Sequence, residues 1–120
     1  MRSCRRHLLW YSGDDALNLA HLSQGAVGIV SVVGHLAGRQ YGEMIAAVAA
    51  GNLARAIDIH RQLIPVVNAV MHITQGPIMV KAALHDRGVI ASDTLRLPLI
   101  SATTDQLARV RDGIEQSGLS

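Results

Sequence analysis

Two short apolar runs near the start of the chain are the only segments with a β-strand pattern, and this limits the folds open to it. The first, residues 8–11, ends at a Ser-Gly-Asp-Asp turn, and the second, residues 26–33, is β-branched without strict alternation. Continuous apolarity is typical of strands buried on both faces of a parallel sheet. Each run leads into a helical pattern, which predicts two βα units. Because two strands cannot close a barrel, either they complete another sheet or they are marginal.

Helical patterns and their stop signals cover most of the remaining chain. The expected helices lie at residues 16–24, 35–50, from residue 53 onward, 77–88 and 103–118, with an extended connection at 89–100. Pro65 lies inside the third of these and predicts a kink near residues 61–64. The last helix carries a capping-box signature, Thr103-x-x-Gln106, and a stop at Gly118. The sequence therefore predicts a mostly helical chain with a small parallel β component.

The composition excludes several classes of protein. With 120 residues, 49% of them hydrophobic and 17% charged, the chain fits at most one globular domain and is not disordered. Its only cysteine, Cys4, cannot close an internal disulfide, which suits a reducing cytosol, so we expect a cytoplasmic protein. No apolar stretch approaches the roughly 18 residues of a membrane-spanning helix, and residues 8–11 are too short for the core of a secretory signal. We expect neither a membrane anchor nor a signal peptide.

Positive charge gathers at the amino end of the chain. Residues 1–7 hold three of the 11 lysines and arginines and none of the nine acids, so the rest of the chain is slightly acidic. A nucleic-acid surface needs cations clustered along one element, often with aromatic residues between them. Here the other cations are scattered, and there are only three aromatic residues. We therefore expect no nucleic-acid binding.

The turn after the first expected strand is the strongest candidate for a binding site. In βα folds, substrates lie beyond the carboxyl ends of the strands, where a glycine lets backbone approach a ligand and an acid can hydrogen-bond it. Gly13 and Asp14 occupy this position. The alternative is that Asp14 or Asp15 only caps the next helix. Gly28 and Gly34 carry a similar ambiguity between close packing and approach to a ligand.

Histidine, cysteine and lysine residues form no recognisable catalytic or metal motif. The six histidines include no H-x-x-x-H pair, so we expect no metal site. His60 lies on an apolar stripe and is expected to be a hydrogen-bonded packing residue, while His35 follows the second strand near a plausible pocket. Cys4 has no catalytic partner. Lys81, the only lysine, lies in mid-helix, which favours a solvated or packing role over Schiff-base chemistry.

Four ordered motifs resemble one enzyme family. They are YSGDDALN at residues 11–18, GAVGIVSVVGH at 25–35, PIMVKAAL at 77–84 and DTLRLP at 93–98. Over residues 8–118 their intervals resemble those in the carboxyl-terminal part of 4-hydroxy-tetrahydrodipicolinate synthase, also called dihydrodipicolinate synthase. The DTLRLP motif favours this lysine-pathway branch over N-acetylneuraminate lyase and other aldolases that share the barrel.

The resemblance implies an α/β fold, the C-terminal piece of a (β/α)8 TIM barrel with a helical C-terminal extension. Barrel strand seven would fall at residues 8–12 and strand eight at 29–33. The implied division is a non-family segment at 1–7, the last two βα units at 8–51 and the helical extension at 52–120. The Arg-rich character of the first segment fits an internal or shifted start better than a designed arm.

The resemblance also implies a reaction that needs residues outside this chain. In the family, a lysine on strand six forms a Schiff base with pyruvate, which then attacks L-aspartate 4-semialdehyde in lysine and diaminopimelate synthesis. That lysine, the proton-relay tyrosines and threonine, and the arginine that holds the semialdehyde carboxylate all lie upstream of the covered region. We expect no catalytic residue here. The positions that match the pyruvate pocket are Gly13, Asp14 and Val30, whose family counterpart makes a main-chain contact, and Lys81 matches the helical extension.

These implications predict a synthase fragment that is inactive alone and uses no cofactor. The family assembles as a homo-oligomer, a tetramer in the typical case, so we expect self-association. Two alternatives stay open: a non-catalytic helical association module, or one half of a split enzyme whose second chain supplies strands one to six.

Overall fold

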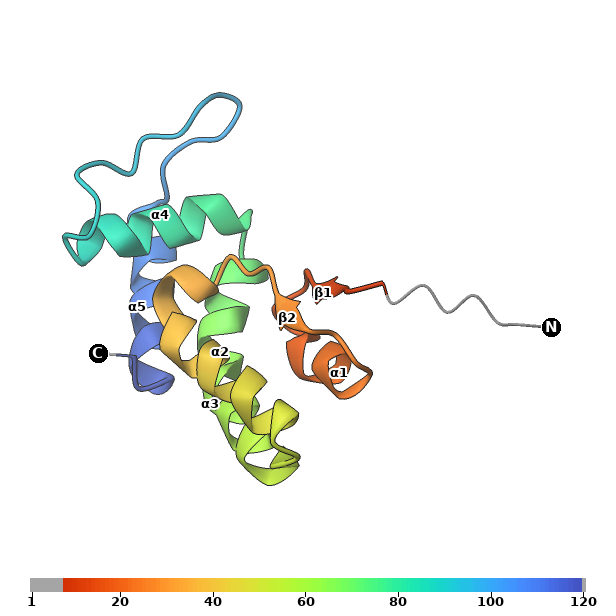
Figure 1. Cartoon of the computed structure of the whole chain (residues 1–120). Coiled ribbons are helices and arrows are strands. Elements are labelled where there is room, and N and C mark those ends of the chain that lie inside the picture. Colours follow the sequence, from red (N-terminus) through yellow and green to blue (C-terminus); the bar gives the residue numbers. More distant parts are fainter. Residues whose placement is uncertain (1–7, 120) are drawn as a thin grey trace.

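One pair of short parallel strands precedes a group of helices, in the order β1, α1, β2, α2, α3, α4, α5 (Figure 1). The computed structural model describes residues 8–119. Strands β1 (Tyr11–Ser12) and β2 (Gly28–Ile29) pair in parallel, with Tyr11 opposite Gly28 and Ser12 opposite Ile29. Helix α1 (Asn18–Ser23) connects them. This arrangement confirms the predicted βα order.

Four longer helices follow the strand pair and hold most of the core. They are α2 (Gly34–Ala49), α3 (Leu53–Met71), α4 (Gly76–Asp86) and α5 (Thr104–Gln116). Helix α3 packs against both α2 and α5, and α4 turns by 107° relative to α3 (Figure 1). The largest fully buried apolar side chains are aliphatic or methionine: Met44, Ile59, Leu63, Met79, Val33, Val66, Val70 and Val110. The chain is mostly helical, as predicted, and its core packs without phenylalanine.

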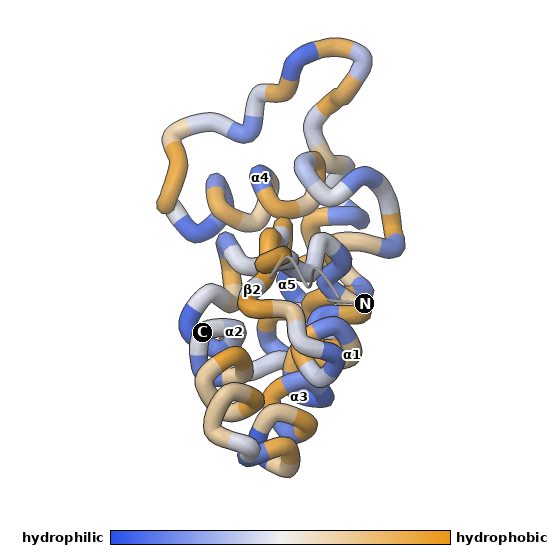
Figure 2. The backbone as a smooth tube through the Cα atoms, turned by 45° about the vertical axis from the view of Figure 1, so that its right-hand side comes forward, coloured by the Kyte–Doolittle hydropathy of each residue, from blue (hydrophilic) through white to orange (hydrophobic). Residues whose placement is uncertain are grey.

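The strands are shorter and more exposed than the sequence predicts. Leu8, Leu9 and Tyr11 are 81%, 71% and 57% exposed, and Val30 after β2 is 70% exposed. Figure 2 shows hydrophobic residues along the β2 segment. The prediction that both apolar runs are buried is wrong over part of their length, although Ser12 and Gly28 within the strands are buried. Burial on both faces of a parallel sheet requires neighbouring strands, and this sheet has only two.

Helix α1 begins later than predicted, and no acid caps it. Its N-cap residue is Leu17, which makes no side-chain capping bond. The Asp14 carboxylate instead accepts a hydrogen bond of 2.9 Å from the Ala16 N–H, in a turn before the helix. The expectation that Asp14 or Asp15 caps this helix is therefore wrong. A short polar side chain can satisfy the backbone of a turn as readily as that of a helix end.

Helix α5 docks where proline interrupts the hydrogen bonding of α3. Helix α3 runs as one element with Pro65 inside it, and proline provides no N–H. Next to it, the Val66 N–H donates to the Ser117 hydroxyl at 3.1 Å. A Cβ built on Gly113 of α5 would lie 2.6 Å from Ala69 Cβ and 3.0 Å from the Pro65 carbonyl oxygen. The two helix backbones are therefore in close contact at this point.

The last two helices have the boundaries that local signals predict. Proline occupies the first turn of α4, and Gly88 follows that helix with φ of 69°. At α5 the Thr103 hydroxyl accepts from the Gln106 N–H at 3.2 Å, and the Gln106 side-chain oxygen accepts from the Thr103 N–H at 2.9 Å. This reciprocal pair confirms the capping box.

The connection between α4 and α5 has no helix or strand, as predicted, and extends away from the helices (Figure 1). Its Leu97 is 85% exposed. The Lys81 ammonium donates a hydrogen bond to the Thr94 carbonyl and so holds the connection to α4. Lys81 thus lies in mid-helix, as expected, and makes an exposed structural contact.

No single helix within residues 8–119 is long and apolar enough to cross a membrane. Helices α3 and α4 reach that length and hydropathy only as a sharply bent pair. Both bury apolar side chains in the core, which accounts for their composition. Residues 1–7, where we placed a separate segment and Cys4, lie outside the described residues.

Candidate functional site

The carboxyl ends of β1 and β2 meet at one edge of the strand pair. The Val30 N–H donates to the Ser12 carbonyl at 2.7 Å, which fixes the chain leaving β2 beside the chain leaving β1. Gly13, Asp14 and Val30 follow directly and are all exposed. A Cβ built on Gly13 would meet nothing within 4 Å, so the backbone there faces open space. The fold therefore brings the three predicted site residues to one open edge.

Asp15 joins the two loops at this edge. Its side chain is 4% exposed, and one carboxylate oxygen accepts from the backbone N–H groups of Val32 at 3.1 Å and Val33 at 3.0 Å. The other oxygen accepts from the Ser31 hydroxyl and from the Asn18 amide, the latter at 3.1 Å. The carboxylate thus lies at the amino end of α2, where the helix dipole favours negative charge.

Sequence reasoning missed this role of Asp15. It considered only a cap for the adjacent helix, whereas the partners at Ser31 and Val33 lie 16 and 18 residues further along the chain. No local spacing in the sequence indicates contacts over such separations. The hydrogen bonds that Asp15 accepts from residues 31–33 hold the segment that directly follows Val30. They therefore fix the backbone at the open edge.

Ser12 of β1 and His21 of α1 form a second polar contact. The Ser12 hydroxyl and His21 Nδ1 share a hydrogen bond of 2.9 Å, and the rings of Trp10 and His21 pack in an edge-to-face arrangement with centroids 5.6 Å apart. Ser12 is 1% exposed. The contact therefore joins β1 to α1 and offers no accessible nucleophile.

Two of the glycines noted in the sequence serve close packing. A Cβ on Gly28 would lie 2.9 Å from the Tyr11 ring, and one on Gly34 would lie 3.2 Å from the Ser31 hydroxyl oxygen. That hydroxyl also accepts a hydrogen bond of 2.7 Å from the Gly34 N–H. The structure favours packing over ligand approach at both positions.

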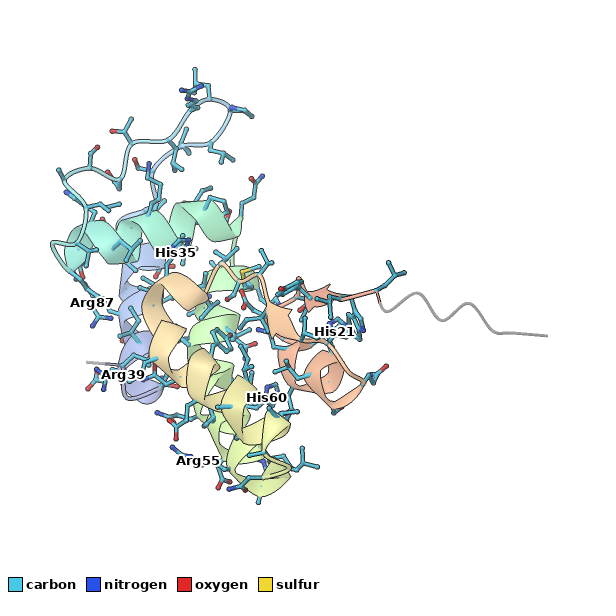
Figure 3. All side chains as sticks on the ribbon, viewed as in Figure 1. His21, His35, Arg39, Arg55, His60 and Arg87 are labelled. Atoms are coloured by element: carbon cyan, nitrogen blue, oxygen red, sulfur yellow. The ribbon has the colours of Figure 1, made fainter. Side chains whose placement is uncertain are left out.

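The two histidines noted in the sequence lie on α2 and α3 (Figure 3). His35 lines a groove with Leu84, Arg87 and Val89, between α2 and the end of α4. His60 lines a separate cavity between α2, α3 and the turn before α1, and burial lowers its pKa. Within residues 8–119, no group of three or more histidine, cysteine or acidic side chains is placed to hold a metal ion.

Two parallel βα units with one open carboxyl edge, followed by a helical group, match the end of a (β/α)8 barrel with a helical extension. Solved dihydrodipicolinate synthases have this fold. The Thermotoga maritima enzyme matches 97% of this chain with a TM-score of 0.89 and 35% identity, over 39% of its own length. A structure described as a monomeric dihydrodipicolinate synthase variant gives the same TM-score and identity. The fold is therefore that of the C-terminal part of a TIM-barrel enzyme.

The sequence comparisons identify the family. The model of the dihydrodipicolinate synthetase family matches residues 1–117, and the chain belongs to this family. The match extends across the boundary that we drew after residue 7. The 4-hydroxy-tetrahydrodipicolinate synthase of Kineococcus radiotolerans is 49% identical over 116 residues, which are 97% of this chain and 38% of that protein. The synthase of Heliobacterium modesticaldum is 44% identical over 119 residues and covered to 39%. The chain thus spans somewhat more than a third of the length of these relatives.

Proposed function

We propose that this chain supplies the carboxyl-terminal part of a 4-hydroxy-tetrahydrodipicolinate synthase. Residues 8–51 would provide the last two βα units and residues 52–120 the helical extension. The observation that carries the proposal is the placement of Gly13, Asp14 and Val30 at one open strand edge in a chain 49% identical to such a synthase. In the complete enzyme the substrates would be pyruvate and L-aspartate 4-semialdehyde. The role of that enzyme in lysine synthesis favours a cytoplasmic location.

The open edge suits recognition of a small keto acid by backbone groups. Gly13 has no side chain to block approach, and Val30 is exposed beside it. Peptide N–H and carbonyl groups can orient pyruvate without a further charge, and the Asp14 carboxylate adds a polar group at the rim. The edge would thus form one wall of the pyruvate pocket and position the substrate for an amine from elsewhere in the barrel.

Covalent catalysis needs an amine that this stretch of chain does not place at the edge. A Schiff base forms through a lysine whose pKa is lowered by a desolvating or cationic pocket. Lys81 is the only lysine, and its ammonium donates a hydrogen bond to the Thr94 carbonyl in the helical extension. The 120-residue chain alone should therefore bind no pyruvate covalently.

Treatment of the isolated chain with pyruvate and borohydride should give no reduced adduct by intact-mass spectrometry. The lysine that attacks pyruvate in the complete enzyme is absent, and Lys81 is engaged elsewhere. The full-length synthase of Kineococcus radiotolerans serves as the positive control. A stoichiometric adduct that disappears in the variant Lys81→Ala would contradict the proposal.

Co-expression with a fragment carrying barrel strands one to six should restore synthase activity. The variant Gly13→Val should lower the restored kcat/KM by about tenfold or more, because a side chain there obstructs backbone contact with substrate. Gly42→Val is the matched control, since a Cβ at either glycine meets nothing within 4 Å and Gly42 lies on the outer surface of α2. A folded, stoichiometric complex without activity would refute the split-enzyme form of the proposal.

The exposed strand pair also favours a second candidate, a module that associates through this face. Leu8 and Leu9 are 81% and 71% exposed. On its outer side, each of the two strands has no further strand paired with it among residues 8–119. Contiguous apolar surface and open edges are typical of interfaces. Sedimentation should show concentration-dependent homo-oligomers. A monomer at all concentrations that melts cooperatively would argue against this candidate.

A further inference from the structure

An open groove lies between the first turns of α2 and the ends of α4 and α5. It consists of two adjoining hollows of about 320 Å³ and 340 Å³, both lined by Leu36 and Arg87. Each volume falls at the lower end of the roughly 300–1,000 Å³ of small-molecule sites. The other residues that line the groove are His35, Arg39, Gln40, Leu84, Val89, Gly118 and Leu119. Residues 13, 14 and 30 are not among them, so the groove is separate from the proposed pyruvate pocket.

The charged side chains that line this groove are all cationic. Arg39 enters from α2 and Arg87 from the end of α4, and no aspartate or glutamate lines either hollow. Figure 3 labels both arginines at the left of the view. The chain after residue 7 is slightly acidic overall, so the groove differs in charge from the rest of the molecule. A hollow lined by charge of one sign attracts ligands of the opposite sign.

The acid closest to Arg39 on α2 is engaged by another arginine. Glu43 lies one turn beyond Arg39, where an ion pair within the helix would be possible. Its carboxylate instead accepts from the Arg55 guanidinium at 2.6 Å. Arg39 forms no ion pair with an acidic side chain among residues 8–119.

The acids near Arg87 are placed in the same way. Asp86 accepts from Arg111 through both carboxylate oxygens, with one of the two bonds at 2.8 Å. Asp86 and Glu115 line a different hollow, which Arg87 also borders. Arg87 forms no ion pair with an acidic side chain of the described chain. Two guanidinium groups from separate elements thus face one groove without a carboxylate from residues 8–119 to neutralise them.

Apolar side chains form the rest of the groove wall. Leu36 borders both hollows, and Leu84 and Val89 continue the wall on the α4 side. A guanidinium group presents its N–H donors in a planar fork that matches the two oxygens of a carboxylate. A hydrated inorganic anion would gain nothing from the leucines, whereas a hydrocarbon tail would bury apolar surface against them. The lining therefore fits an anionic head joined to a short apolar tail.

We propose that this groove binds small organic carboxylates, with the carboxylate held by Arg39 and Arg87 and the hydrocarbon tail against Leu36 and Leu84. The site consists only of residues of this chain. It does not depend on the proposed synthase function, and either proposal can fail without the other.

Amide NMR of the 120-residue chain, at constant ionic strength, measures the binding of three probes. Pentanoate should give saturable shifts of the Leu36 and Gln40 amides. Acetate has the same charge but lacks three methylene groups, so it should bind at least about fivefold more weakly. Pentanamide has the same tail without the charge and should also bind at least about fivefold more weakly. Either of these two probes binding as tightly as pentanoate would overturn the proposal.

The variants Arg39→Gln and Arg87→Gln each remove one charged donor. Each should weaken pentanoate binding by about fivefold or more. Arg61→Gln is the matched control, because Arg61 is an exposed arginine of α3 that lines neither hollow and pairs with no acidic side chain among residues 8–119. Circular dichroism checks that every variant is folded. If pentanoate does not saturate on the wild-type chain, or if Arg61→Gln weakens binding as much as the two groove variants, the proposal is wrong.

Discussion

Replacing Asp15 with alanine is expected to lower the free energy of unfolding by about 3 kcal/mol. The substitution removes the acceptor for four donors, including the buried backbone N–H of Val33. It also removes the negative charge at the amino end of α2. Each buried donor left without a partner costs about 1–3 kcal/mol. Urea unfolding followed by circular dichroism of the helices measures the change.

Asp14→Ala is the matched control for Asp15→Ala. Asp14 is an exposed neighbour of the same residue type, with one hydrogen bond to the Ala16 N–H. Its loss should cost less than about 1 kcal/mol. Hydrogen exchange adds a local readout, because Asp15→Ala should also speed exchange at Val32 and Val33. Equal destabilisation by the two variants would show that the buried carboxylate does not hold the loops together.

Gly113→Ala should destabilise the chain by about 2 kcal/mol, although alanine favours helix. The added Cβ would lie 2.6 Å from Ala69 Cβ, 3.0 Å from the Pro65 carbonyl oxygen and 3.3 Å from Val66 Cα. The last two are backbone atoms, so no side-chain rotation can relieve the overlap. Helix α5 must move away from α3, which also weakens the bond from the Val66 N–H to Ser117. Thermal and urea unfolding measure the loss.

Gly42→Ala provides the opposite expectation for the same chemical change. Gly42 lies in α2, and a Cβ there would meet nothing within 4 Å. Alanine should therefore stabilise the chain by about 0.5–1 kcal/mol, through helix propensity alone. If both glycine variants stabilise the protein, α5 does not pack against α3 as closely as described.

Local signals predicted the ends of elements, whereas long-range contacts escaped prediction. The capping box at Thr103 and the stop at Gly88 depend on residues within one turn, and both are confirmed. The bond between Val66 and Ser117 joins residues 51 apart, and that between Asp15 and Val33 joins residues 18 apart. Such pairs exist only once helices have packed, so sequence spacing does not indicate them.

The candidate site was predicted in position more than in detail. A glycine and an acid after a strand indicate the carboxyl edge of a parallel sheet, and the structure brings Gly13 and Asp14 to that edge beside Val30. The role of Val30 came from family resemblance and remains a prediction. Strand burial was predicted wrongly, because periodicity reports what a strand can bury and not which neighbours are present.

The open strand pair links the lifetime of this chain to its assembly. Exposed leucines such as Leu8 and Leu9 resemble the unfolded segments that chaperones and proteases recognise. Covering the pair, whether by further barrel strands or by a second copy, would remove that signal. The cellular abundance of the chain should therefore depend on whether this surface is covered.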